Sequence, residues 1–328
     1  MNRPLALIVN LGTPERPDAD AVRAFLAEFL SDPDVVDYPW WFWQPVLRGI
    51  VLRRRPARVA ALYRTIWEAG GSPLAVGTQR VADAFAAKLG DAAEVRIAYR
   101  YGRPSLAAEL ERGLAEGERE IYLVPLFAHR TSSATGTILR LAARIARENG
   151  AQGGPARVRR ALVAPDAPGF IEAQAGRCEE AFAAAGVRPG HLVVSFHGIP
   201  VRYDRREQGR YQADCRLTTD ALLARLGWDP AQATLAYQSR FGPERWLAPA
   251  TAALLEELPR CGVRSVAVVT PGFLTEGLET IEEIGAQGAE TFHHAGGENF
   301  VRVPTVTDHP AFVAALAERF ERSRAARA

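Results

Sequence analysis

The chain carries one pattern of residues twice in the same order, and this repeat limits the folds open to it. An apolar run ends in residues 11–14 (LGTP), and a second run, far downstream, ends in residues 197–200 (HGIP). Both are typical of a buried strand followed by a glycine-x-proline turn. Three further pairs follow in order: 100–102 with 240–242, 121–127 with 266–273, and 166–170 with 308–312. We therefore predict an internal duplication. In the last pair, Asp166 and Asp308 are expected to cap helices that carry a proline in the first turn.

Length and composition agree with two globular domains. The chain has 328 residues, and 48% of them are hydrophobic, which is enough to build two apolar cores. Strand-like runs alternate with alanine-rich helical stretches at 81–89, 106–116, 138–148 and 173–185. This alternation predicts an α/β fold with parallel sheets covered by helices on both faces.

The two predicted domains are residues 1–160 and residues 161–328. They are expected to meet near the turn-forming residues 152–155 (QGGP). Strands near 158–163 and 300–303 are expected to complete the first and the second sheet, respectively.

Several classes of function are disfavoured by composition. A formal net charge of +2 gives no nucleic-acid footprint. The apolar run 5–9 is too short for a signal peptide, and no run approaches transmembrane length. The cysteines, Cys178, Cys215 and Cys261, are scattered, which disfavours a zinc or iron–sulfur cradle and indicates a reducing compartment. We expect a cytoplasmic protein.

The duplicated strand ends differ in one chemically useful residue. His197 stands where the first copy has Leu11. The carboxyl ends of parallel strands face the crevice in which α/β proteins bind ligands, so an imidazole there is a candidate for chemistry. The alternative is a core histidine whose hydrogen bonds are satisfied.

An acidic segment, 271–284 (PGFLTEGLETIEEI), is the second candidate. If residues 276–284 are helical, Glu276, Glu279 and Glu283 share one face. One interpretation is an acidic first turn that favours the helix dipole. The other is an acidic path that carries cations or protons to His197. An imidazole facing a carboxylate suits a divalent metal that must be released, or proton abstraction near neutral pH.

These motifs together resemble those of the ferrochelatase family, over essentially the whole chain. The matching strings are NLGTP at 10–14, FLSDPDVVD at 29–37, GGSPL at 70–74, SFHGIP at 195–200, QSRFGPERWLAP at 238–249 and PGFLTEGLETIEEI at 271–284. The resemblance implies two similar Rossmann-like domains, each with a four-stranded parallel sheet flanked by helices. It also implies the terminal step of haem synthesis, the insertion of Fe²⁺, as substrate, into protoporphyrin IX with release of two protons.

By the same resemblance, His197 and Glu279 are the catalytic and metal-binding residues. His197, kept neutral by partial burial, is the expected proton acceptor. Glu276 and Glu283 are expected to support Glu279 and to contact the substrates.

Four residues of the first half are further candidates for substrate binding. Leu11 occupies the position of His197 in the first copy. Arg100 follows a strand and could bind a propionate, although an internal salt bridge is an equal alternative. At 128–130 the chain departs from the family pattern, and its His129 and Arg130 are expected to alter propionate binding or to add a titrating group.

Residues 38–55 (YPWWFWQPVLRGIVLRRR) combine aromatic, apolar and basic side chains. Trp43, Leu47, Ile50 and Val51 would share one helical face. The resemblance implies an apolar lip over the porphyrin pocket, and the composition suits peripheral contact with the inner face of the membrane. An ordinary amphipathic helix packed on its domain is the alternative.

Three other functions stay open. One is a chelatase for coproporphyrin or for another metal, and another is a non-catalytic tetrapyrrole- or metal-binding protein. A nucleotide-dependent α/β enzyme is disfavoured because neither G-x-G-x-x-G nor a Walker A loop follows a strand. No iron–sulfur cluster is predicted, because the tail after Asp308 has no cysteine.

Overall fold

Two compact units make up the chain. The structure, a computed structural model, describes residues 3–116, 120–151 and 157–326. The first unit runs to Leu162 and also includes the residues from Leu316 onward, whereas the second comprises Val163–Ala315. The expected division after residue 160 lies two residues from this boundary. The predicted meeting point at 152–155 lies outside the described residues.

The end of the chain belongs to the first unit and not to the predicted domain 161–328. The reason is packing of the last helix, α12 (Pro310–Ala325). Its Phe320 makes edge-on ring contacts with Phe85 and Tyr122 of the first unit. The Ser323 hydroxyl donates a hydrogen bond of 3.2 Å to the Arg160 carbonyl. Burial of the apolar face of α12 therefore assigns the end of the chain to the first unit, although it follows the second unit in the sequence.

Each unit contains one four-stranded parallel sheet with the same connectivity. The first sheet has the order β2-β1-β3-β4, and the second has the order β6-β5-β7-β8. The strands are β1 (Leu5–Asn10), β2 (Glu94–Tyr99), β3 (Glu120–Pro125), β4 (Arg157–Arg160), β5 (His191–His197), β6 (Ala233–Gln238), β7 (Ser265–Val269) and β8 (Asn299–Arg302). The predicted duplication and the predicted parallel α/β architecture are confirmed by this shared order.

Helices connect successive strands in both units. In the first unit they are α1 (Ala19–Ser31), α2 (Trp40–Val46), η1 (Leu47–Val51), α3 (Leu52–Ile66), α4 (Pro73–Leu89), η2 (Gly90–Ala92), α5 (Leu106–Ala115), η3 (Ser132–Gly136) and α6 (Thr137–Ala151). In the second they are α7 (Pro168–Ala185), α8 (Val201–Arg206), α9 (Arg210–Leu226), η4 (Pro230–Gln232), α10 (Thr251–Arg260), η5 (Leu278–Gly288) and α11 (Ala289–His294). Within the described residues, no helix has both the length and the apolar composition required to cross a bilayer.

The helices after the last pair of sequence anchors begin later than expected. Pro168 and Pro310 are in the first turns of α7 and α12, as predicted. The residue before α7 is Ala167, which provides no side-chain cap, so Asp166 is not the N-cap. Before α12, it is His309 whose Nδ1 accepts a hydrogen bond of 3.3 Å from the Ala311 amide. Each expected aspartate lies one residue too early.

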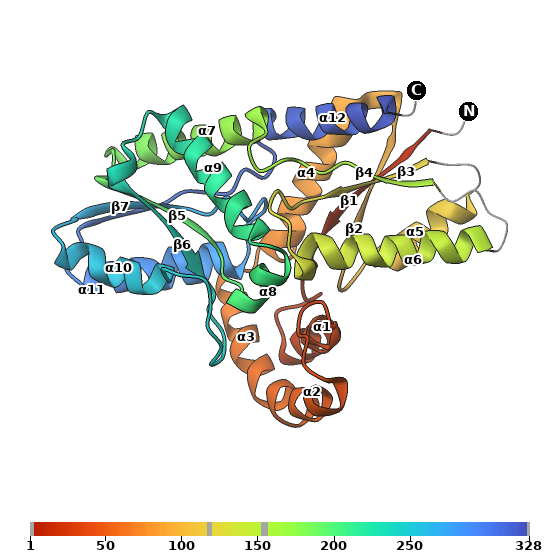
Figure 1. The fold of residues 1–328 in the computed structure, drawn as a ribbon, viewed down its shortest axis with the longest axis horizontal. Coiled ribbons are helices and arrows are strands. Elements are labelled where there is room, and N and C mark those ends of the chain that lie inside the picture. The colour runs from red at the N-terminus through yellow and green to blue at the C-terminus, as the bar shows by residue number, and fades with distance from the viewer. Residues whose placement is uncertain (1–2, 117–119, 152–156, 327–328) are drawn as a thin grey trace. The chain divides into compact units, whose positions relative to one another are not determined.

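The second sheet is enclosed by two helical layers. Figure 1 shows α7 and α9 on one face and α10 and α11 on the other. Alternate side chains of β5 fill these two layers because side chains point to opposite faces along a strand. Leu192, Val194 and Phe196 join the core beneath α7 and α9. Val193 joins the opposite core, with residues from α10, η5 and α11.

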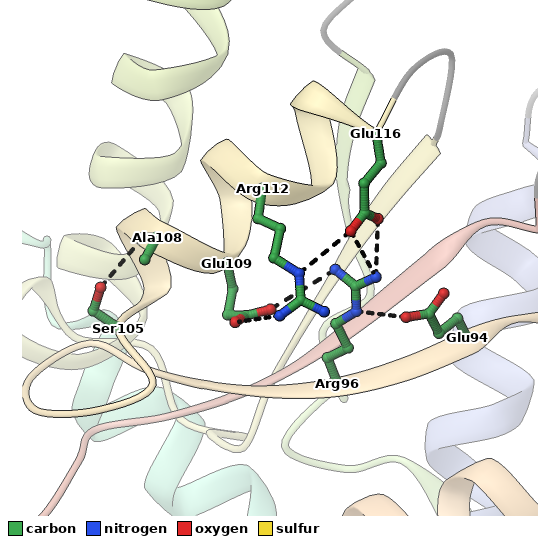
Figure 2. A network of polar contacts seen from close by, with 7 residues as sticks. All are labelled: Glu94, Arg96, Ser105, Ala108, Glu109, Arg112 and Glu116. Carbon is green, nitrogen blue, oxygen red and sulfur yellow. Dashed lines mark hydrogen bonds and ion pairs between the residues drawn. The ribbon is translucent and has the colours of Figure 1, made fainter.

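The first sheet has β2 at its edge, and charged side chains occupy this edge. Arg96 of β2 lies among Glu94, Glu109 and Glu116, the last two carried by or adjoining α5 (Figure 2). Its guanidinium donates to Glu116 at 2.9 Å. Charge on an edge strand disfavours pairing with the edge of another chain. A recess of about 840 Å³ follows β2 and α4, and none of the predicted site residues lines it.

The aromatic segment 38–55 forms α2, η1 and the start of α3. Leu47 is buried, and Trp43 and Val51 pack against the same core cluster, as their predicted common face requires. Ile50 is 52% exposed, so the prediction that it shares this face is wrong. The π-helical geometry of η1 changes the angular spacing of its side chains, which a 3.6-residue period does not anticipate.

Candidate active site

His197 is the last residue of β5 and extends beyond one of its neighbouring strands. β6 pairs with β5 as far as His197↔Gln238, whereas β7 pairs only as far as Val194↔Val269. By strand alternation, the imidazole projects on the same face as Val193, which is the face covered by η5. The side chain is exposed, so the expectation of partial burial is wrong. His197 is the last residue of its strand, and β7 stops pairing three residues earlier, so this end of the sheet leaves the side chain open to solvent.

Nδ1 of His197 is hydrogen-bonded, whereas Nε2 has no hydrogen-bond partner among the residues that the structure describes. Nδ1 lies 2.7 Å from the Gly198 carbonyl oxygen. Because a carbonyl only accepts hydrogen bonds, we assign the proton to Nδ1. The lone pair of Nε2 is then available to a proton or a metal ion. Phe273 flanks the ring at 6.1 Å between centroids.

The acidic segment folds differently from the predicted helix. A π-helix, η5, begins at Leu278, with Gly277 as its N-cap. Glu276 precedes it, so the prediction that Glu276, Glu279 and Glu283 share one helical face is wrong. Glu276 accepts hydrogen bonds of 2.9 and 3.0 Å from Arg302 of β8 and one of 3.0 Å from the Thr305 amide. This partnership neutralises Glu276 and holds it against the end of the second sheet.

Glu283 is bound by one residue in an unusual backbone conformation. Both oxygens accept 2.6 Å hydrogen bonds from Ser239, one from its amide and one from its hydroxyl. Ser239 follows β6 with φ +64°, a region that costs free energy for residues other than glycine. The double hydrogen bond stabilises this conformation.

The pKa of Glu283 depends on its burial and on the charges of Glu279 and His197. Burial raises the pKa of the Glu283 carboxyl above its usual value. Hydrogen bonds from Ser239 oppose this increase, the negative charge of Glu279 adds to it, and His197 opposes it. Glu283 therefore retains a proton at a higher pH than an exposed glutamate.

Gln238, the last residue of β6, is hydrogen-bonded both to Gly198 after β5 and to Glu279 in η5. Its side-chain amide donates a 3.0 Å hydrogen bond to the Glu279 carbonyl. The main-chain carbonyl of Gln238 accepts a 2.7 Å hydrogen bond from the Gly198 amide. Sequence reasoning assigned no role to Gln238 or Ser239, although both lie in the family-like string QSRFGPERWLAP. Their contacts span 40 to 44 residues along the chain, so no local pattern reveals them.

Gly277 leaves space for the carboxylate of Glu279. A Cβ atom at Gly277 would lie 3.2 Å from Glu279 Oε2. The main chain at Gly277 is extended, with φ −162°, so its torsion angle does not require glycine. The missing side chain thus leaves space beside the Glu279 carboxylate.

The remaining predicted residues follow the strand ends of the first sheet. Leu11 follows β1 and is partly buried. Arg100 follows β2, and its guanidinium forms an ion pair with Asp32 and donates a 2.7 Å hydrogen bond to the Thr137 hydroxyl. Of the two interpretations of Arg100, this geometry favours the internal salt bridge over propionate binding.

His129 and Arg130 follow β3, but they differ in exposure. Arg130 is partly buried, whereas only 5% of His129 is exposed. Desolvation lowers the pKa of His129 to about 3. Burial disfavours the imidazolium ion, so His129 takes up a proton less readily than an exposed histidine does.

His129 should make stability depend on pH. Its pKa is about 3 in the folded chain against an ordinary value near 6.5, so only the unfolded chain binds this proton as pH falls between these values. The free energy of unfolding should then decrease below about pH 6.5, by up to about 1.4 kcal/mol per pH unit. Urea denaturation at about pH 5 and about pH 7.5 should show a smaller pH dependence for His129→Gln than for wild type.

The exposed His294 provides the control for this measurement. His294→Gln should retain the wild-type pH dependence. An equal pH dependence in His129→Gln and wild type would show that His129 does not cause it.

The second unit carries nitrogen and oxygen donors at the end of its sheet. Within residues 3–116, 120–151 and 157–326, no group of three or more His, Cys, Asp or Glu side chains could hold a metal ion. His197 Nε2 and the carboxylates of Glu279 and Glu283 provide nitrogen and oxygen donors of the types that bind divalent iron. Cys178 and Cys215 are buried, and Cys261 is exposed. The absence of an iron–sulfur cluster stays a prediction.

Comparison with known proteins places this geometry in a family. The family model described as Ferrochelatase matches residues 6–324. Ferrochelatase of Pectobacterium atrosepticum is 43% identical over 304 residues, which cover 93% of each chain. That of Methylibium petroleiphilum is 42% identical over 321 residues, which cover 95% of this chain and 85% of the relative.

Solved structures agree at the level of the fold. The sirohydrochlorin chelatase SirB from Bacillus subtilis subspecies spizizenii, in complex with cobalt, is 13% identical, with a TM-score of 0.55. The similarity covers 98% of this chain and 95% of SirB. SirB from Bacillus subtilis with Fe³⁺ gives a TM-score of 0.57 at 12% identity. Together with the match across nearly the whole sequence, these findings show that the chain belongs to the ferrochelatase family, lyases that insert a metal into a porphyrin.

Proposed function

We propose that this protein inserts Fe²⁺ into protoporphyrin IX, releases two protons and forms protohaem. The main support is the exposed imidazole at the carboxyl end of β5, whose Nδ1 is hydrogen-bonded to the Gly198 carbonyl and whose charge acts on the Glu283 carboxyl. Iron remains Fe²⁺ throughout, so no oxidant or reductant is required. The two protons come from the pyrrole N–H groups of the porphyrin.

His197 accepts pyrrole protons through Nε2. The hydrogen bond from Nδ1 to the Gly198 carbonyl fixes the tautomer and orients the ring. As the ring becomes positive, the nearby carboxylates stabilise the imidazolium ion. General base catalysis of this kind needs a base within hydrogen-bond reach of the proton that it removes.

Glu279 and Glu283 carry protons away from His197 or guide the metal ion toward it. Glu283 holds a proton more readily than an exposed glutamate because burial raises its pKa. Glu279 precedes it by four residues in η5, and its charge contributes to the raised pKa. A charged carboxylate next to one that is easily protonated can pass a proton along the helix.

Anaerobic turnover of the purified protein tests the proposal. With Fe²⁺ and protoporphyrin IX, the free-base absorbance bands should disappear and the bands of protohaem should appear in proportion. Porphyrin binding without metal insertion would contradict the proposal and support a tetrapyrrole-binding protein. Parallel reactions with coproporphyrin, and with Zn²⁺ in place of Fe²⁺, distinguish the remaining chelatase alternatives by their kcat/KM.

Residues 38–55 are proposed to make peripheral contact with an anionic membrane. Trp40 and Trp41 are 75% and 73% exposed, and Phe42 and Ile50 are also exposed. Arg48, Arg53 and Arg54 are exposed on the same segment. Aromatic rings partition into the headgroup region, and each nearby arginine adds about 1 kcal/mol on an anionic surface.

Vesicle co-sedimentation should detect this contact. The protein is expected to bind vesicles that contain phosphatidylglycerol more strongly than neutral phosphatidylcholine vesicles. The double variant Trp40→Ser/Trp41→Ser should weaken binding at least about tenfold, since two exposed indoles are lost. Leu217→Ser, at another exposed apolar residue, is the control. Equal binding by all three proteins would contradict the contact.

A further inference from the structure

The peptide unit that joins His197 to Gly198 is held at both of its polar ends. The Gly198 amide donates a 2.7 Å hydrogen bond to the Gln238 carbonyl on β6. The His197 carbonyl accepts a 2.7 Å hydrogen bond from the Tyr211 hydroxyl. One clamp comes from the neighbouring strand, whereas the other comes from helix α9.

The second clamp replaces a strand partner. β7 stops pairing with β5 at Val194, three residues before His197. A carbonyl near the end of a buried strand costs free energy if it has no partner. Tyr211 supplies the missing donor from the first turn of α9, and only 3% of its surface is exposed.

The position of Tyr211 is itself well defined. Its backbone amide donates a 3.1 Å hydrogen bond to the buried carboxylate of Asp204. Its ring belongs to the core cluster beneath α7 and α9. These contacts hold the hydroxyl at the His197 carbonyl. Because the phenol is almost fully buried, it is not open to the substrate.

The orientation of the clamped peptide determines where the imidazole is held. His197 Nδ1 donates to the carbonyl of Gly198, the next group along the main chain. Rotation of the 197–198 peptide would move this acceptor and therefore Nε2. Gly198 has no room for a side chain, since a Cβ atom there would lie 2.7 Å from the main-chain oxygen of Gln238 and 3.2 Å from the Trp246 ring.

We infer that Tyr211 is a positioning residue, which holds the main chain of His197 through its hydroxyl and so sets the direction of the Nε2 lone pair. The inference rests on the proposed role of His197 as proton acceptor. It adds to the site a residue of α9, on the face of the sheet opposite to η5. Tyr211 acts through His197 and does not touch the substrate.

Tyr211→Phe tests this role because it removes one hydroxyl and little else. With Fe²⁺ and protoporphyrin IX, kcat should fall about tenfold, while KM for the porphyrin should stay within about twofold. The matched control is Tyr237→Phe. Tyr237 is buried in the same core cluster, and its hydroxyl makes no hydrogen bond to His197 in the described part of the chain. Tyr237→Phe should keep the wild-type kcat.

Unchanged kcat in Tyr211→Phe would overturn the inference. Equal losses in both variants would also overturn it, since they would indicate general loosening of the core. Failure of wild type to turn over would instead count against the proposed function.

Imidazole ¹⁵N shifts of the neutral His197 ring test the clamp without turnover. Wild type should show the Nδ1–H tautomer, and Tyr211→Phe should show a mixture of tautomers. If Tyr211→Phe does not fold, wild type alone still decides, because a predominant Nε2–H tautomer would overturn the inference.

Discussion

His197→Ala is expected to lower kcat for Fe²⁺ insertion at least a hundredfold, which corresponds to about 2.7 kcal/mol of activation free energy. The variant removes the Nε2 lone pair that we propose as the acceptor of the pyrrole protons, and no other imidazole follows a strand end of the second sheet within the described residues. Anaerobic loss of the free-base absorbance bands measures the rate. Porphyrin affinity, followed by fluorescence quenching, should change by less than about threefold, because the loss concerns the transition state and not substrate binding.

The control for this variant is His294→Ala on α11. His294 is exposed and lies in the same unit, so its removal should leave kcat unchanged. A decrease of less than about tenfold in His197→Ala would contradict the role of His197, since general base catalysis contributes about a hundredfold or more.

Glu279→Gln is expected to reduce kcat by a similar factor, at least about a hundredfold. The amide keeps the shape of the side chain but removes its charge, so Glu283 loses a neighbour that raises its pKa. The same anaerobic assay measures the effect. If Glu279 mainly guides the ion, the loss should instead appear in kcat/KM for Fe²⁺ and not in kcat.

Glu290→Gln, on α11 directly after η5, is the matched control because Glu290 is exposed. Its kcat should equal that of wild type. Residues that act as one unit have non-additive effects on kcat. The kcat of the double variant His197→Ala/Glu279→Gln should therefore lie within about threefold of the kcat of the slower single variant. Fully multiplicative losses would show that the two side chains act in separate steps.

Much of the fold was predictable because its determinants are local and repeated. Apolar runs of strand length, glycine-proline turns and alanine-rich helical stretches recur in the same order in both halves, and the parallel sheets β2-β1-β3-β4 and β6-β5-β7-β8 repeat that order in space. The same reasoning placed His197 at a strand end. Local reasoning was wrong at the end of the chain, where Phe320 packs against Tyr122 of the first unit.

The acidic segment shows why a helical period was insufficient. A 3.6-residue repeat places Glu276 on the same face as Glu279 and Glu283. In the structure the helix starts at Leu278 and is a π-helix, while Arg302, 26 residues downstream, takes Glu276 as its partner. The period of the helix depends on tertiary contacts that no short window of residues contains.

The sequence by itself determined the duplicated α/β architecture, the strand-end position of His197 and the family, since these follow from residue types in order along the chain. Only the tertiary structure decided that Glu283 is hydrogen-bonded to Ser239, that Arg100 is paired with Asp32, and that Tyr211 holds the His197 main chain. The physical reason is that a hydrogen bond or an ion pair depends on distance and burial, and residues far apart in the sequence acquire these only when the sheet and its helices have packed.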